Sequence, residues 1–99
     1  MTVVVTGVGA VTALGKSARE TFDRIARGER GLAPLTLFDP GEVRSKIVAE
    51  VAGIPPLADP TLSRTSELAL RAAREALAEA RVDPRSCRVG LVLGGTTAG

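Results

Sequence analysis

The sequence predicts an α/β fold in which short strands alternate with helices. Aliphatic and β-branched runs at 3–6, 46–53 and 88–95 are typical of strands. The segments 17–27 and 65–81 between them repeat apolar residues at the three-to-four-residue spacing of helices. The order strand, helix, strand, helix, strand favours a sheet that is covered by helices in layers. Because only 2% of the residues are aromatic, we expect a core of Val, Leu, Ile and Ala.

The first predicted strand, residues 3–6, reads VVVT, which is a continuous β-branched run. Such a run suits a strand that is covered on both faces of its sheet. Gly7, Gly9 and Gly15 follow closely and predict a loop before the first helix.

The first predicted helix begins at Ser17, whose side chain can cap it. Glu20 lies three residues later and completes the S-x-x-E pattern of a capping box. Gly28 stands where a left-handed C-terminal cap is expected, so we predict a helix over 17–27. Its apolar residues form one stripe, which consists of Ala18, Phe22, Ile25 and Ala26.

Residues 29–45 are predicted to form an irregular loop, because Pro34, Pro40 and Gly41 interrupt them. The following segment, 46–53, reads KIVAEVAG and alternates in the manner of a half-exposed strand. A proline-rich linker is predicted after it, with Pro55, Pro56 and Pro60.

The second predicted helix, 65–81, carries a wide stripe of small side chains that would let another helix or a sheet approach closely. Its other side is charged, and Glu67 and Arg71 are spaced for a favourable pair, so we interpret that side as solvent-exposed. The helix is expected to end before the Asp-Pro pair at 83–84, and the last strand, 88–95, follows. The stripe consists of Ala69, Ala72, Ala73, Ala76, Leu77 and Ala80.

Composition argues against several kinds of site. The chain has no histidine and one cysteine, Cys87, so it lacks the usual ligands of zinc and copper and the commonest general base. The net charge of +2 comes from scattered residues without aromatic platforms, which argues against nucleic-acid binding. A single cysteine fits a reducing compartment, and no apolar run approaches the roughly 20 residues of a membrane span. We therefore expect a cytoplasmic protein that binds neither a metal nor a cofactor.

The glycine loop fits a dinucleotide-binding fingerprint at only two of its three glycines. Gly7 and Gly9 match G-x-G-x-x-G, but Thr12 stands at the third position. The helix also begins only at Ser17, several residues too late to receive the phosphate. A P-loop fails as well, because Ala10 occupies the place of its first glycine. A small nucleotide-binding domain therefore remains only as a weaker alternative.

Five segments, taken in chain order, resemble the start of the β-ketoacyl-acyl carrier protein synthases. They read VVVTGVGAVTALG, GERGLAPLTLFDP, KIVAEVAG, SRTSELALRAAREALAEARVD and RVGLVLGGTTAG. The resemblance covers residues 1–99 and implies that the chain is an N-terminal fragment of a β-ketoacyl synthase N-terminal domain. The implied fold is the N-terminal portion of a thiolase-like fold, a layered βαβαβ half-domain that is incomplete at the C-terminus.

The resemblance also implies a reaction, the decarboxylative Claisen condensation of an acyl thioester with malonyl-carrier protein in fatty acid or polyketide synthesis. In that family a cysteine thiolate takes the acyl chain, while histidines stabilise the oxyanion and assist decarboxylation. These residues lie beyond the segments that this chain matches, so we expect that it is not competent alone. The implied partners are acyl carrier protein and acyl thioesters. A non-catalytic partner subunit of the chain-length-factor type is the alternative.

The candidate nucleophiles of this chain have simpler interpretations. Cys87 precedes a predicted strand, and neither a helix N-terminus nor a histidine is present to activate it. Ser17 is explained as a helix cap. Thr96, Thr97 and Gly99 match a family loop near the active site and the dimer interface, but a turn after the strand explains them more simply. We therefore assign no catalytic, cofactor-binding or metal-binding residue.

The predicted strands and the second helix carry more apolar surface than 99 residues can cover. Unpaired strand edges and uncovered apolar faces favour association. We therefore expect the chain to form a homo-oligomer or to belong to a larger synthase polypeptide.

Overall fold

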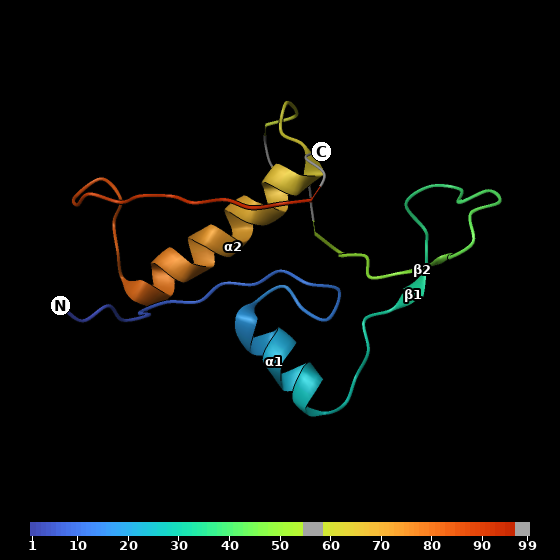
Figure 1. The fold of residues 1–99 in the computed structure, drawn as a ribbon, viewed down its shortest axis with the longest axis horizontal. Coiled ribbons are helices and arrows are strands. Elements are labelled where there is room, and N and C mark those ends of the chain that lie inside the picture. The colour runs from blue at the N-terminus through green and yellow to red at the C-terminus, as the bar shows by residue number, and fades with distance from the viewer. Residues whose placement is uncertain (55–58, 97–99) are drawn as a thin grey trace. The chain divides into compact units, whose positions relative to one another are not determined.

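A computed structural model describes residues 1–54 and 59–96 (Figure 1). The chain divides into two compact units. One unit, here the split unit, combines Met1–Gly9 with Pro56–Gly99, and the other, the continuous unit, is Ala10–Pro55. The described elements are α1 (Ala18–Ala26), β1 (Ala33–Pro34), β2 (Ile47–Val48) and α2 (Arg64–Ala80).

Helix α1 confirms the prediction for 17–27. Ser17 is its N-cap in an extended conformation, and the Ser17 hydroxyl accepts a hydrogen bond from the backbone N–H of Glu20 at 3.1 Å. The Glu20 carboxylate lies 3.4 Å from the backbone N–H of Lys16, so it reaches back one residue further than in a regular capping box. Gly28 follows the helix with a φ of +77°, the left-handed conformation that the sequence predicts there.

Helix α2 confirms the prediction for 65–81, although its two caps were not predicted. The Ser63 hydroxyl accepts a hydrogen bond from the backbone N–H of Ser66 at 3.2 Å and so caps the first turn. The helix ends because Arg81 turns left-handed, with a φ of 57°. The backbone N–H of Val82 then bonds the carbonyl oxygen of Leu77 at 3.1 Å. The chain therefore leaves the helix before the Asp-Pro pair at 83–84, as the sequence predicts.

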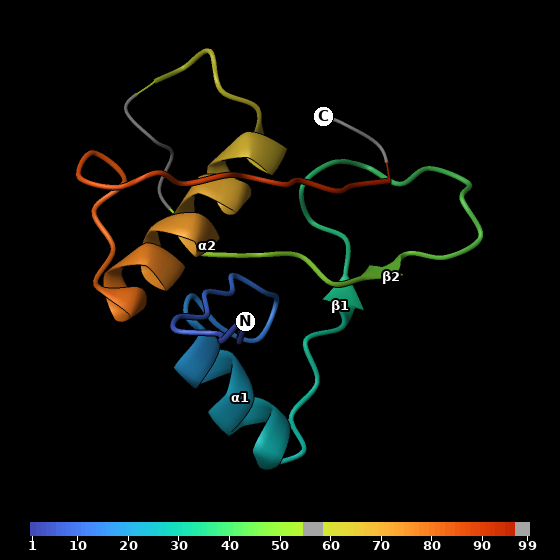
Figure 2. The same cartoon turned by 60° about the vertical axis from the view of Figure 1, so that its left-hand side comes forward.

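The strand predictions were largely wrong. Residues 3–6 and 88–95 belong to no strand, since a strand needs a neighbour for its N–H and C=O groups and the described residues supply none. Of the predicted strand 46–53, only β2 forms. It pairs antiparallel with β1, in register Ala33↔Val48 and Pro34↔Ile47. Strand β1 therefore lies inside the segment that was predicted to be irregular (Figure 2).

In the split unit, the first glycines pack directly against α2. A Cβ added at Gly7 would overlap the carbonyl oxygen of Ala76, and one added at Gly9 would overlap that of Ala72. Between them, the backbone N–H of Val8 donates to the Glu79 carboxylate at 3.2 Å. The main chain around Gly7 and Gly9 thus packs closely against the small-residue stripe of α2, as the alanines of the stripe predict. This segment is not part of a sheet.

The predicted aliphatic core is not formed among the described residues. None of their hydrophobic side chains is buried, and the most buried polar side chain, that of Thr21, is 9% exposed. The apolar side chains of 88–95 are largely exposed and reach 97% at Val92, although this segment runs alongside α2 in both views (Figures 1 and 2). No helix in the described ranges is long and apolar enough to cross a membrane.

Candidate functional site

The loop that follows the glycines closes on itself as a tight turn. Thr12 and Gly15 exchange backbone hydrogen bonds of 2.8 Å and 3.3 Å. The Thr12 hydroxyl also accepts from the backbone N–H groups of Leu14, at 3.1 Å, and of Gly15, at 3.2 Å. A phosphate-binding loop presents such N–H groups to its ligand. Here the threonine at the third fingerprint position occupies them, which argues physically against a dinucleotide site.

A pair of hydroxyl groups joins this turn to α1. The Thr12 and Thr21 hydroxyl oxygens lie 2.9 Å apart, and Thr21 is nearly buried. A buried hydroxyl that lacks a partner would be costly, so each of these two satisfies the other. Both hydroxyls thus serve the structure. A nucleophilic hydroxyl needs a general base as its partner, and here each has a second hydroxyl instead.

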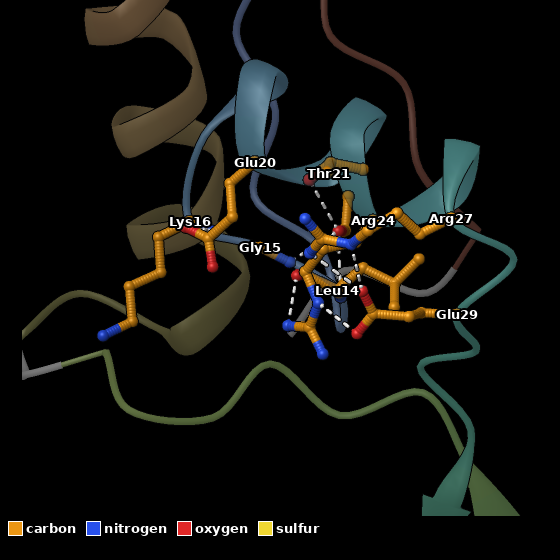
Figure 3. A network of polar contacts seen from close by, with 9 residues as sticks. Leu14, Gly15, Lys16, Glu20, Thr21, Arg24, Arg27 and Glu29 are labelled. Atoms are coloured by element: carbon orange, nitrogen blue, oxygen red, sulfur yellow. Dashed lines mark hydrogen bonds and ion pairs between the residues drawn. The ribbon is translucent and has the colours of Figure 1, made fainter.

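A second network, drawn in Figure 3, fixes the same turn from the end of α1. The Arg24 guanidinium donates to the Leu14 carbonyl oxygen at 2.6 Å and to the Glu29 carboxylate at 3.0 Å. Arg27 donates to the other oxygen of Glu29 at 2.9 Å. The hydrogen bond from Arg27, followed by that from Arg24, lowers the pKa of Glu29 below its ordinary value. All three side chains are at least one-third exposed, so the ion pairs contribute little to stability.

Glu50 forms a clamp that the sequence analysis missed. Its carboxylate accepts from the backbone N–H of Thr36 at 2.7 Å, from the Thr36 hydroxyl at 2.6 Å and from the backbone N–H of Leu37 at 3.2 Å. The alternation along 46–53 indicates a half-exposed segment but does not indicate what its polar side chain bonds. No local signal shows that this carboxylate reaches main chain fourteen residues earlier.

Cys87 lies on the surface, in the turn that follows α2. Its thiol donates to the carbonyl oxygen of Asp83 at 3.3 Å, and a carbonyl oxygen is not a base that could activate it. Within the described ranges no cluster of three or more Cys, Asp or Glu side chains could hold a metal ion. Of the other candidates, Ser17 caps α1, Thr96 is exposed, and Thr97 and Gly99 lie outside the described residues.

Each unit carries a shallow apolar hollow. In the split unit a groove of about 380 Å³ lies between α2 and residues 91–94, with Thr65 and Ser66 also among its lining residues. In the continuous unit a hollow of about 240 Å³ is lined by Thr12, Thr21 and mostly aliphatic side chains. Neither hollow contains a base, a thiol or an acid among its lining residues, so each can offer packing but no chemistry.

Comparison with known protein families identifies the family to which this chain belongs. The family model for the β-ketoacyl synthase N-terminal domain matches residues 1–99. The chain belongs to this family. Membership implies a thiolase-like α/β fold, and the two helices and the small sheet are consistent with a part of it.

Curated relatives of this chain include a polyketide synthase subunit and a 3-oxoacyl-[acyl-carrier-protein] synthase. It is 31% identical to the tetracenomycin polyketide synthase ketoacyl synthase alpha subunit of Streptomyces glaucescens, over 93% of this chain and 24% of that protein. It is 29% identical to the 3-oxoacyl-[acyl-carrier-protein] synthase 2 of Coxiella burnetii, again over 93% and 24%. The chain therefore spans about a quarter of the length of these relatives. No solved structure gives a significant match.

Proposed function

We propose that this chain is part of a β-ketoacyl-acyl carrier protein synthase and supplies framework to it, with the reacting groups provided by other parts of the enzyme. In the proposed reaction a cysteine thiolate carries the acyl group as a thioester. Malonyl-carrier protein loses carbon dioxide, and the resulting carbanion attacks the acyl carbonyl and expels the thiolate. The proposed partners are acyl carrier protein and its acyl thioesters. Residues 1–99 would form the N-terminal portion of the synthase domain.

One observation supports the proposal that this chain is a scaffold and that other parts of the enzyme supply the reacting groups. The family match extends over the whole chain, yet the chain has no histidine and its single thiol faces a carbonyl oxygen. The hydroxyls of Thr12 and Ser17 are used in a turn and a cap. Condensation needs a nucleophile, a means of forming the thiolate and an oxyanion site. The described residues bring none of these together, so the proposal assigns this chain the scaffold that holds them.

A chimaera with a known relative tests the proposal directly. Residues 1–99 would replace the matching segment of the Streptomyces glaucescens subunit, and incorporation of labelled malonyl groups from malonyl-carrier protein would be measured in its complete synthase. We expect condensation to persist within about tenfold, because the reacting groups come from the recipient. A folded chimaera that assembles like the parent subunit but does not condense would contradict the proposal.

One substitution in the same chimaera tests whether Cys87 acts as a nucleophile. Cys87→Ala should leave condensation unchanged, because the thiol faces no base. Loss of activity in a Cys87→Ala chimaera that still melts at the parent temperature would give Cys87 a catalytic role. The chain alone, supplied with acyl- and malonyl-carrier protein, should produce no condensation above buffer.

The chain-length-factor alternative stays open for a specific reason. The chain is 33% identical to a Streptomyces coelicolor protein named as β-ketoacyl synthase 1 of the actinorhodin polyketide, and 32% identical to the one named synthase 2. Identity therefore does not separate these two relatives. The rest of the synthase discriminates between the two hypotheses: a nucleophilic cysteine at a strand-to-helix turn would favour the enzyme, and its absence the non-catalytic partner.

The proposal extends to the fold. We propose that residues 3–6 and 88–95 become paired strands of a layered thiolase-like half-domain when the rest of the domain is present. Their β-branched and aliphatic composition favours strands. Amide hydrogen exchange would test this. Backbone N–H groups of 89–93 should exchange much more slowly in the chimaera than in the chain alone, and equal rates would contradict the pairing.

A further inference from the structure

We draw no further inference here: the strongest candidate, the apolar groove that α2 forms with residues 91–94 of the split unit, is open and unpartnered, and nothing in the structure shows what covers it.

Discussion

At the scale of single residues, close contact with α2 leaves room only for glycine at positions 7 and 9. Gly7 and Gly9 lie where the main chain touches the carbonyl oxygens of Ala76 and Ala72, so any Cβ would collide with backbone that cannot move aside easily. Phosphate binding requires glycine for a different reason, which is the approach of a ligand. Gly7 and Gly9 therefore serve packing against α2, and we expect their replacement to lower the stability of the fold.

Replacing Gly7 by Ala should destabilise the protein by about 2 kcal/mol, because the added methyl group overlaps the Ala76 carbonyl oxygen. Urea unfolding followed by circular dichroism measures the loss. Gly90→Ala is the matched control, since a Cβ at Gly90 meets nothing within 4 Å. Equal effects of the two substitutions would contradict the contact between residue 7 and α2.

Glu29 gives a prediction with a definite pH dependence. Because its pKa is lowered in the folded chain by Arg27 and Arg24, its stabilising contribution is present at neutral pH and is lost as the pH falls through the folded pKa. Glu29→Gln should therefore be less stable than the parent at neutral pH and equal to it in acid. Urea midpoints at both pH values measure this. Glu42→Gln, at an exposed loop position, is the control for removal of a carboxylate.

At the scale of elements, residues at the ends of each helix determine where it begins and where it ends. Each begins at a serine whose hydroxyl accepts a backbone N–H, Ser17 for α1 and Ser63 for α2. Each ends in a left-handed residue, Gly28 just after α1 and Arg81 at the end of α2. The two C-terminal ends differ in cost, because an arginine meets a steric penalty in this conformation that glycine does not.

Removing the Ser63 cap should cost about 1 kcal/mol, because the Ser66 N–H loses its acceptor. We expect Ser63→Ala to lower the helical signal and the thermal midpoint. Ser63→Asp keeps a side-chain acceptor at the N-terminus of α2 and should retain both. A loss of equal size in Ser63→Asp would show that the hydrogen bond is not what stabilises the helix end.

Arg81→Gly should stabilise the protein by about 1 kcal/mol, because glycine adopts the left-handed conformation without steric cost. Thermal unfolding of Arg81→Gly and Arg81→Lys provides the comparison. The lysine variant keeps the charge and the penalty, so its midpoint should not change. A lower midpoint for Arg81→Gly would mean that the arginine side chain contributes more than its backbone costs.

The sequence predicts an element well when the residues that stabilise it lie close together in the chain, and poorly when they lie far apart. Helix α1 is specified by residues within one or two turns of one another, so its cap, stripe and end were predictable. Strands depend on partners. The run at 88–95 has strand composition but no pairing neighbour among the described residues, and Pro34, which marked an irregular loop, lies in β1 at a position paired with Ile47. The Glu50 clamp spans fourteen residues through a side chain, and no periodicity encodes such a contact.

At the scale of the whole molecule, apolar exposure is the dominant property. Val3 is 84% exposed and Val92 is 97% exposed, and no hydrophobic side chain is buried in the described part of the chain. Exposed apolar patches and unpaired extended segments promote association. The chain by itself should therefore sediment as concentration-dependent oligomers. A monodisperse monomer over the same range of concentrations would contradict this prediction.

The hydrogen bond between Val8 and Glu79 joins residues 71 positions apart, and this separation governs the order of assembly. During synthesis the first nine residues leave the ribosome roughly 4 to 14 s before their helical partner, at about 5–20 residues per second. The continuous unit, Ala10–Pro55, is synthesised entirely within that interval. The opening glycines therefore stay unpaired until α2 has been made.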